Sequence, residues 1–268
     1  MFHTHMRYTK FMALAVMAIG ILAGAAEAQT TNLYQGNGTQ TPQSQGWLEE
    51  LAPGVTPVSA GGSTTFDTTS SSTLEGGYSN DYATGTPVNS SFPSLNPTNG
   101  FSVALDVEIN SETHSSANRA GFDWIVLGSD GKGVELDFWE TDIWAQQYSA
   151  SAFTHSATED VDAENSAGFD STFSTEGAIN DYVLSIQGGN YSLTDNGTTI
   201  LTGQTHDYSG SGMLPYTLDN YVFIGDDTTE ANASETFSLL SVTVPEPTSA
   251  CVLLVIGTGA LARRRRRA

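Results

Sequence analysis

Alternation of apolar and polar positions is the main pattern in the central part of the chain. Residues 101–109 read Phe-Ser-Val-Ala-Leu-Asp-Val-Glu-Ile, with an apolar side chain at every second position. A period of two residues puts these side chains on one face of an extended segment, which predicts a half-buried antiparallel strand. Shorter apolar or alternating segments predict further strands over residues 122–127, 134–139, 182–186, 191–194, 198–201, 221–224 and 237–244.

Turns rich in glycine and asparagine separate these segments. Ser-Asp-Gly-Lys-Gly at residues 129–133 is a hairpin-type connection, and Asn196-Gly197 tolerates the positive φ that a tight hairpin requires. No long segment repeats its apolar residues with a period of 3.6, so the sequence indicates no long helix. We predict an all-β fold, a two-sheet antiparallel sandwich or jelly roll, over residues 29–244. Residues 29–99 are richer in Ser, Thr, Gly and Pro, and we expect fewer and looser strands there.

The N-terminal end differs from this body. Residues 1–28 carry Arg7 and Lys10, then a short apolar run, then Ala-Glu-Ala at residues 26–28. This order is typical of a secretory signal peptide that is removed before Gln29. The apolar run is shorter than the roughly 20 residues of a membrane anchor, which favours export with cleavage.

The C-terminal end, residues 245–268, resembles the PEP-CTERM sorting signal of Gram-negative bacteria that produce exopolysaccharide. The resemblance rests on a Pro-Glu-Pro tripeptide, a short apolar segment and an arginine cluster. These signal residues are Pro245, Glu246, Pro247, Arg263, Arg264, Arg265, Arg266 and Arg267. The resemblance implies an exosortase and the secretion machinery as partners, transient association with the inner membrane, and delivery to the cell surface or extracellular matrix. The positive-inside tendency agrees, because it keeps the arginines cytoplasmic and the body outside.

The body is strongly acidic. The whole chain has a formal net charge of −21, but seven of its nine Lys and Arg residues lie in the two ends. The body therefore sets 28 carboxylates (30 less Glu27 and Glu246) against two cations, Arg119 and Lys132. Such a surface repels phosphate backbones and anionic lipid, which excludes nucleic acid as its partner. The single cysteine, Cys251, lies in the tail, so the body forms no disulfide.

Three segments of the body carry a resemblance to known folds. YVLSIQGGNYSLTDNGTTILTG at 182–203 and YVFIGDDTTEANASETFSLLSVTV at 221–244 resemble the closing strands of concanavalin-like lectin and laminin-G-like jelly rolls. NRAGFDWIVLGSDGKGVELDFWETDIWAQ at 118–146 is similar to exported bacterial domains of the choice-of-anchor type. The resemblance implies a concanavalin-like sandwich, a fold that hosts lectins, enzymes and structural modules alike.

A group of three carboxylates, Glu135, Asp137 and Glu140, is the sharpest chemical motif. Their sequence, Glu-Leu-Asp-Phe-Trp-Glu, resembles the Glu-x-Asp-x-x-Glu signature of family 16 glycoside hydrolases, which are retaining enzymes. The resemblance implies Glu135 as nucleophile, Asp137 as the carboxylate that tunes it and Glu140 as general acid/base. A retaining mechanism needs two carboxyl groups about 5–5.5 Å apart. In a regular strand Glu140 points away from the other two, so convergence requires a β-bulge near Phe138 or Trp139.

A second interpretation of this segment stays open. Glu135 and Asp137 can form the solvent face of a strand whose Leu136 and Phe138 face the core. The turn before Glu135 lacks the Trp-Pro element of the enzymes, and Thr-Asp-Ile-Trp after the motif departs from their pattern.

Two tryptophans and one arginine are candidate ligand-binding residues. Trp139 and Trp144 lie close to acidic residues in the sequence, and exposed rings there can stack on sugars, whereas buried rings are sandwich core. Arg119, as one of two cations in the body, is expected to form an ion pair or to donate to loop carbonyls.

Calcium is the cofactor to which the composition points. Asp226 and Asp227 follow a predicted strand in a Gly-Asp-Asp sequence, and concanavalin-like domains often hold calcium at such rims. A solvated acidic loop explains the same residues. His114, His155 and His206 lack the spacing of zinc ligands.

These observations favour an exported, non-catalytic protein of the cell surface or extracellular matrix that binds polysaccharide. The alternative function is a retaining glycoside hydrolase that acts on β-linked polysaccharide. A bulged strand that brings Glu135, Asp137 and Glu140 into one groove would distinguish the alternative from the first interpretation.

Overall fold

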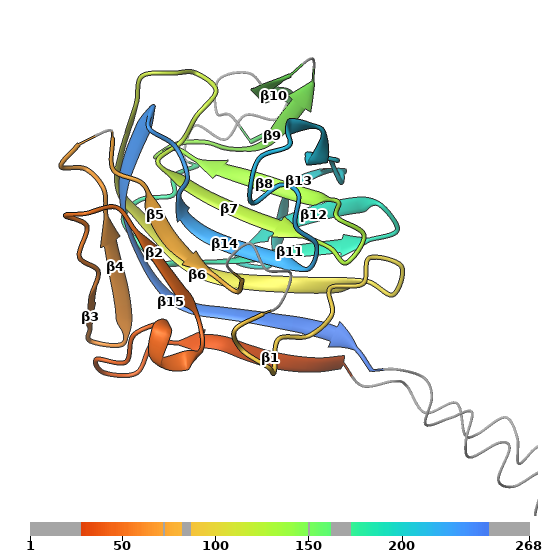
Figure 1. The fold of residues 1–268 in the computed structure, drawn as a ribbon, viewed down its shortest axis with the longest axis horizontal. Coiled ribbons are helices and arrows are strands. Elements are labelled where there is room, and N and C mark those ends of the chain that lie inside the picture. The colour runs from red at the N-terminus through yellow and green to blue at the C-terminus, as the bar shows by residue number, and fades with distance from the viewer. Residues whose placement is uncertain (1–27, 72, 82–86, 150, 162–172, 247–268) are drawn as a thin grey trace, which may run out of the picture. The chain divides into compact units, whose positions relative to one another are not determined.

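A computed structural model describes residues 28–71, 73–81, 87–149, 151–161 and 173–246 (Figure 1). The compact unit that carries the strands spans Thr30–Val244. The predicted signal peptide lies outside the described residues except for Ala28. The predicted sorting signal also lies outside them except for Pro245 and Glu246.

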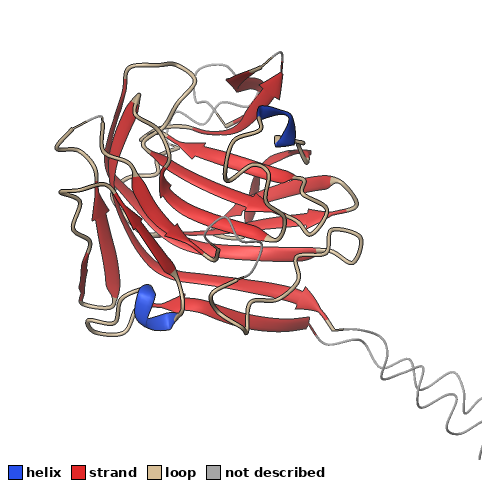
Figure 2. Ribbon diagram, viewed as in Figure 1, coloured by secondary structure: helices blue, strands red, loops and turns tan. Residues whose placement is uncertain are grey.

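Strands make up almost all regular structure in the described part, and the two helical turns, Gln43–Gln45 and Ser209–Ser211, have three residues each (Figure 2). No described helix has the length and apolar character that crossing a membrane requires.

The first sheet, sheet A, has eight strands. Its order is β13 (Thr198–Gln204), β12 (Asn190–Asp195), β11 (Asn180–Gln187), β6 (Phe101–His114), β15 (Ala231–Pro245), β4 (Ser63–Asp67) and β3 (Val58–Ala60), with β1 (Ala28–Gln35) also paired to β15. Neighbours along this order are antiparallel. The two long strands β6 and β15 run side by side through its middle (Figure 1).

The second sheet, sheet B, has seven strands. Its order is β10 (Ala152–Asp160), β9 (Ile143–Ser149), β8 (Gly133–Phe138), β7 (Phe122–Leu127), β14 (Tyr221–Asp226), β5 (Gly76–Ser79) and β2 (Leu48–Leu51), again antiparallel throughout. The fold is therefore a two-sheet antiparallel sandwich, a concanavalin-like jelly roll, as the sequence predicted.

One face of each sheet forms the main hydrophobic core. Buried and partly exposed residues alternate along β6, and its apolar residues pack against those of β7 and β8. Core members from these three strands include Phe101, Val103, Leu105, Val107, Ile109, Phe122, Trp124, Val126, Val134, Leu136 and Phe138.

Sheet B is buried on its other face as well. Every residue of β7, β8 and β14 is buried, although only alternate ones can face sheet A. The remaining positions lie beneath residues 205–220, hereafter the covering loop. The second apolar cluster comprises Ile125, Leu127, Tyr208, Tyr216, Tyr221 and Phe223. Side chains on the outer face of β7 and β8 are thereby removed from water.

The strands predicted from the sequence are confirmed, most of them with longer bounds than the pattern gave, while β8 is shifted by one residue from the predicted 134–139. Residues 122–127 coincide with β7, and the hairpin at Asn196-Gly197 has φ of 47° and 79°. Residues 28–99 form five strands, more than expected, and β9 and β10 were not predicted.

Candidate functional site

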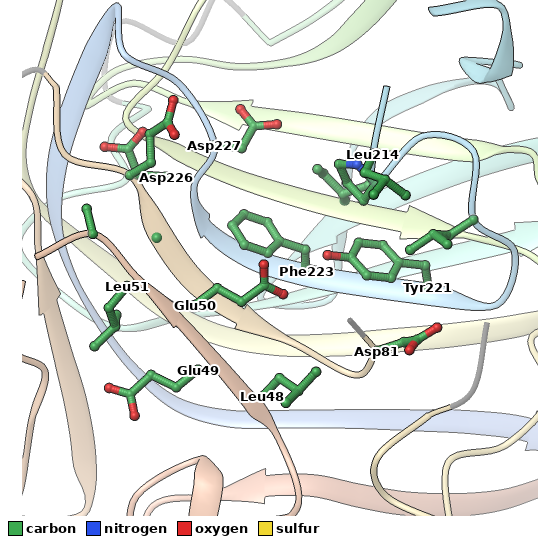
Figure 3. A pocket seen from close by; sticks show the side chains of 16 residues that line it. Leu48, Glu49, Glu50, Leu51, Asp81, Leu214, Tyr221, Phe223, Asp226 and Asp227 are labelled. Carbon is green, nitrogen blue, oxygen red and sulfur yellow. The ribbon is translucent and has the colours of Figure 1, made fainter. Parts of the chain in front are cut away.

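An open groove of about 780 Å³ lies on the outer face of sheet B. It crosses β2, β5, β14 and β7 and is closed on one side by the covering loop (Figure 3). The residues that line it are Leu48, Glu49, Glu50, Leu51, Ala52, Glu75, Gly76, Asp81, Ile125, Leu214, Pro215, Leu218, Tyr221, Phe223, Asp226 and Asp227. Pockets of about 300–1,000 Å³ are typical of ligand sites.

Aromatic and apolar side chains form the floor of the groove. Tyr221 and Phe223 stand on the same face of β14, and Phe223 is the register partner of Ile125 on β7. Figure 3 shows the carboxylate of Glu50 directed toward the two rings from β2. Leu214, on the covering loop, is 58% exposed and supplies an apolar wall.

Carboxylates surround this floor. Burial raises the pKa of Glu49, and burial together with the charge of Asp227 raises the pKa of Glu75. Asp226 and Asp227 stand at the end of β14, and no Lys, Arg or His belongs to the lining. The groove is therefore acidic at its rim and apolar below, which suits a neutral, hydroxyl-rich ligand. Of the lining residues, the sequence singled out Asp226 and Asp227, as candidate calcium ligands. The lining residues of β2 and β5 were missed because these strands gave no strong pattern.

Glu135 and Asp137, two of the predicted catalytic residues, lie outside the groove lining. They project from β8 on the face opposite the main core, since Leu136 and Phe138 belong to that core. The register pairs Asp137 with Asp123 on β7. Carboxylate oxygens of these three acids all lie within 4.8 Å of one another. The second interpretation named the correct face, but the covering loop buries it from solvent.

Burial governs the charge of this acidic cluster, defined as Asp123, Glu135 and Asp137. Removal from water raises the pKa of all three well above the usual range. The charge of Asp227 raises the pKa of Asp123 and Glu135 further, while Arg119 counters the effect at Glu135.

Glu140, the third predicted catalytic residue, does not belong to this group. It follows the end of β8, which pairs with β7 and β9 without a bulge. Its Oε1 accepts a hydrogen bond from the backbone N–H of Glu112 on β6, at 3.1 Å. Asp123, not Glu140, is the third carboxylate that has an oxygen within 4.8 Å of those of Glu135 and Asp137. The sequence signal that could have identified Asp123 is its position as the one acid in the otherwise apolar strand Phe-Asp-Trp-Ile-Val-Leu.

The two candidate tryptophans belong to a cluster of stacked aromatic rings. The ring centroids of Trp139 and His114 are 4.0 Å apart in a stacked arrangement, and those of Trp139 and Trp144 are 4.4 Å apart, edge to face. Trp144 in turn stacks on His155, with the ring centroids 4.2 Å apart. Trp144 is fully buried, so its face is not available to a sugar ring. Trp139 is partly buried and donates from Nε1 to the carbonyl of Arg119. Neither tryptophan lines the groove.

Arg119 has structural contacts of the kind expected from the sequence. Its Nη1 donates to the carbonyl of Asn118 at 2.6 Å, and its Nε lies 3.8 Å from Glu230. The guanidinium also lies over the ring of Phe153, 5.7 Å from its centroid. Arg119 does not line the groove.

The predicted calcium ligands Asp226 and Asp227 have other partners. Asp226 accepts hydrogen bonds from the Thr68 hydroxyl at 2.6 Å and from the Thr228 amide at 3.1 Å, and burial raises its pKa to about 8. Asp227 accepts from the Tyr216 hydroxyl at 2.8 Å. Among described residues, two groups have ligand atoms close enough for one ion, and neither contains Asp226 or Asp227.

Those two groups are the acidic cluster and a second set, Asp142, His155 and Asp160. In the second set, His155 Nε2 lies 3.1 Å from Asp160 and 3.9 Å from Asp142.

Fold and groove together define a class, antiparallel two-sheet sandwiches with an open groove on one sheet. No protein-family model and no curated protein sequence matches the chain. Among solved structures, a carbohydrate esterase from the Shiga toxin-encoding bacteriophage phi24B is similar, with a TM-score of 0.51 and 12% identity, covering 81% of this chain and 100% of that chain.

Two further similar structures are more distant. An endo-1,3-beta-glucanase from Streptomyces sioyaensis has a TM-score of 0.44 and 11% identity, covering 84% of this chain and 99% of that chain. A family 7 alginate lyase has a TM-score of 0.40 and 15% identity, covering 69% of this chain and 82% of that chain. Of the three structures, the phage esterase alone has a TM-score above 0.5, and at 12% identity that likeness bears on the fold and on nothing finer.

Proposed function

We propose that this chain is an exported, non-catalytic protein that binds extracellular polysaccharide in the groove of sheet B. The observation that carries the proposal is the lining of that groove, where the exposed Leu214 and carboxylates such as Glu49 and Glu50 stand over a buried floor of Tyr221 and Phe223. Exposed apolar side chains such as Leu214 pack against the C–H faces of sugar rings, and carboxylates accept hydrogen bonds from sugar hydroxyls. A carbohydrate ligand is also in keeping with the activity named for the similar phage protein, a carbohydrate esterase.

The position of the acidic cluster supports a binding role over hydrolysis. A nucleophile must reach its substrate, whereas Glu135 is 2% exposed and Asp137 is fully buried. The general acid/base of the alternative, Glu140, is hydrogen-bonded to Glu112 on the other sheet. The retaining glycosidase alternative would require the covering loop to move and Glu140 to turn toward Glu135.

The negative charge of the groove lining favours one class of polysaccharide over another. The groove lining holds six carboxyl groups, Glu49, Glu50, Glu75, Asp81, Asp226 and Asp227. Asp226, with a pKa of about 8, carries little charge at neutral pH, so the negative charge of the lining comes from the others. Sulfated or uronate polymers are repelled by such a lining, while neutral ones are not. We therefore propose a neutral polysaccharide as the ligand.

Export and delivery are part of the same proposal. The signal peptide, the Pro245-Glu246-Pro247 tripeptide and the arginine cluster at 263–267 support secretion, processing by an exosortase, and transient association with the inner membrane. Fractionation of the native host tests this part: recovery of the chain in the cytosol with both ends intact would reject it.

Binding is tested by titration calorimetry and pull-down with laminarin, agar, carrageenan and the host exopolysaccharide. We expect binding to a neutral polymer and none to carrageenan. Leu214→Ala, which removes an exposed apolar wall of the groove, should weaken binding about 5-fold or more.

Met213→Ala is the matched control for this variant. Met213 is the neighbouring residue, is 51% exposed, and does not line the groove, so its loss should leave affinity unchanged. Equal effects of the two variants, or no binding to any neutral polymer, would refute the groove as a polysaccharide site.

A further inference from the structure

We infer that Asp123, Glu135 and Asp137, together with the side-chain oxygen of Gln146, form a buried site for one Ca²⁺ ion. The site lies beneath the covering loop and is separate from the lining of the groove. The inference does not depend on polysaccharide binding, and its test has a different readout.

Strand register brings the three carboxylates together. Asp123 on β7 is directly opposite Asp137 on β8, and Glu135 lies two residues before Asp137 on the same face. Their oxygens lie within 4.8 Å of one another. Ca²⁺ binds oxygens at 2.3–2.6 Å, so ligands of a single ion are at most about 5 Å apart. The spacing of the three acids therefore fits one ion.

Few hydrogen-bond donors face the oxygens at this site. Both carboxylate oxygens of Asp137 and Oε2 of Glu135 are buried and have no hydrogen bond of ordinary geometry within the described structure, although the Ala120 amide is close to Asp137 and the Tyr216 hydroxyl is close to Glu135. Asp123 Oδ2 accepts one bond, from the backbone N–H of Asp227 at 3.1 Å. Buried polar atoms without partners are rare in proteins, and each needs a compensating interaction.

A fourth buried oxygen without a hydrogen-bond partner among the described residues, Oε1 of Gln146, comes from β9. Trp144 is the register partner of Asp137, so Gln146, two residues further on, lies on the same face of the sheet. Gln146 is 1% exposed, and its Oε1 has no hydrogen-bond partner. The Tyr208 hydroxyl contacts both the Glu135 N–H and the Gln146 carbonyl, which shows that the two residues are neighbours. An amide oxygen is an ordinary ligand of Ca²⁺.

No described cation neutralises the acidic cluster by direct pairing. Arg119, the cation whose charge acts on Glu135 and Asp137, forms its ion pair with Glu230 and donates to the carbonyl of Asn118. Three carboxylates within contact distance can each be balanced by a proton or together by a cation. A proton turns one carboxyl oxygen into a donor to a single neighbour, whereas one cation can coordinate the carboxylate oxygens and the Gln146 oxygen at once.

The donor set selects the ion. The four side chains offer oxygen only, without His or Cys nitrogen or sulfur, which disfavours Zn²⁺ and Cu²⁺. Mg²⁺ demands regular octahedral geometry and retains several waters, whereas Ca²⁺ accepts irregular sites of six to eight oxygens. An ion in this position joins β7, β8 and β9 directly under the covering loop that carries Leu214.

The test is titration of the full chain, stripped with EDTA, with CaCl2 at constant ionic strength and about pH 7. We expect one Ca²⁺ per chain by calorimetry. We also expect a rise in Tm of roughly 5–10 °C once Ca²⁺ reaches one hundred times its Kd. Tb³⁺ replacing Ca²⁺ should luminesce on excitation of tryptophan, because Trp144 is opposite Asp137. No binding at about 10 mM, above the range of weak extracellular calcium modules, would overturn the inference.

Asp137→Asn assigns the binding to this site. It should lower Ca²⁺ affinity at least 10-fold and abolish the Tb³⁺ signal. In EDTA the variant should be at least as stable as the native chain, because it removes a buried charge without changing shape.

Asp160→Asn is the matched control, since it alters the other candidate group and should leave the affinity for Ca²⁺ unchanged. Loss of binding in Asp160→Asn with native affinity in Asp137→Asn would overturn the assignment. A less stable Asp137→Asn chain in EDTA would also count against a site built for a cation.

Discussion

Glu235 is a carboxyl group buried between the two sheets. Ala233 and Phe237, two positions away on either side of β15, belong to the main core, and Glu235 is 1% exposed with Oε2 unpartnered. Burial raises its pKa well above the ordinary 4.5, and the charges of Asp226 and Asp67 raise it further. The folded chain therefore holds this proton more tightly than the unfolded chain does.

The sign of the pH dependence follows from that difference. A group with a raised folded pKa contributes full stability below its unfolded pKa, and the contribution falls as pH rises above about 4.5. Glu235→Gln removes the titration while keeping the shape. We expect its Tm to match the native chain near pH 4 and to exceed it by about 5 °C or more at pH 7, by scanning calorimetry in EDTA.

Glu230→Gln is the control for this measurement, because Glu230 is exposed and its pair with Arg119 is long. It should change Tm little and without a trend in pH. A Glu235→Gln chain that is less stable than the native chain at every pH would contradict the prediction, since it would show that the carboxylate is a required partner.

At the scale of elements, the Tyr208 hydroxyl bridges a backbone N–H of β8 and a backbone carbonyl of β9, in place of a direct hydrogen bond between the two strands. Tyr208 from the covering loop accepts a hydrogen bond from the Glu135 N–H at 3.1 Å and donates to the Gln146 carbonyl at 2.7 Å. Tyr208 is fully buried, so water cannot take its place. The hydroxyl thus fastens the covering loop to both strands.

Tyr208→Phe should destabilise the chain markedly. It leaves a buried N–H and a buried carbonyl unpaired, at about 1–3 kcal/mol for each group, which lowers Tm by roughly 5–10 °C. Tyr148→Phe is the control, since the Tyr148 hydroxyl donates to the Gly210 carbonyl at an exposed position and its loss should cost about 0.5 kcal/mol or less. An unchanged Tm in Tyr208→Phe would mean that β8 and β9 close up and bond directly.

Alternation along the chain predicted the strands that form the middle of the sandwich. Residues 101–109 and 122–127 have apolar side chains that face the opposite sheet, so burial imposes a readable pattern. Strand β10 lies at an edge, where half-buried polar residues suffice, and its Ala-Phe-Thr-His-Ser-Ala-Thr-Glu-Asp sequence shows no alternation. Edge strands are therefore hard to predict from periodicity alone.

The acidic cluster of Asp123, Glu135 and Asp137 was only partly predictable from the sequence, for a related reason. The sequence singled out Glu135 and Asp137 as carboxylates on one strand face, and the structure places them there. Their burial depends on Tyr208 and Tyr216, which come from a distant loop, and their third partner, Asp123, comes from the neighbouring strand. Burial by residues that are distant in the sequence cannot be predicted from the spacing of residues within one segment.

At the scale of the whole molecule, the two ends and the body carry opposite charge. The ends hold seven of the nine cations, so the body between residues 29 and 244 sets 28 carboxylates against Arg119 and Lys132. Repulsion of this kind keeps a protein soluble and opposes its compact state. The separation suits a body released from a basic tail, which is the order of events proposed for export.

Self-repulsion makes the stability of this chain depend on salt. Screening shortens the range of repulsion to about 10 Å at 0.1 M ionic strength, so the folded state gains more than the expanded unfolded state. We expect Tm in EDTA at pH 7 to rise by several degrees, roughly 3–6 °C, between about 0.01 and 0.5 M NaCl. Choline chloride at equal ionic strength should give the same rise if screening is responsible, and the rise should shrink near pH 4, where carboxylates are protonated. A rise with Na⁺ alone would instead indicate a bound ion, and a falling Tm would show that attraction outweighs repulsion in the folded body.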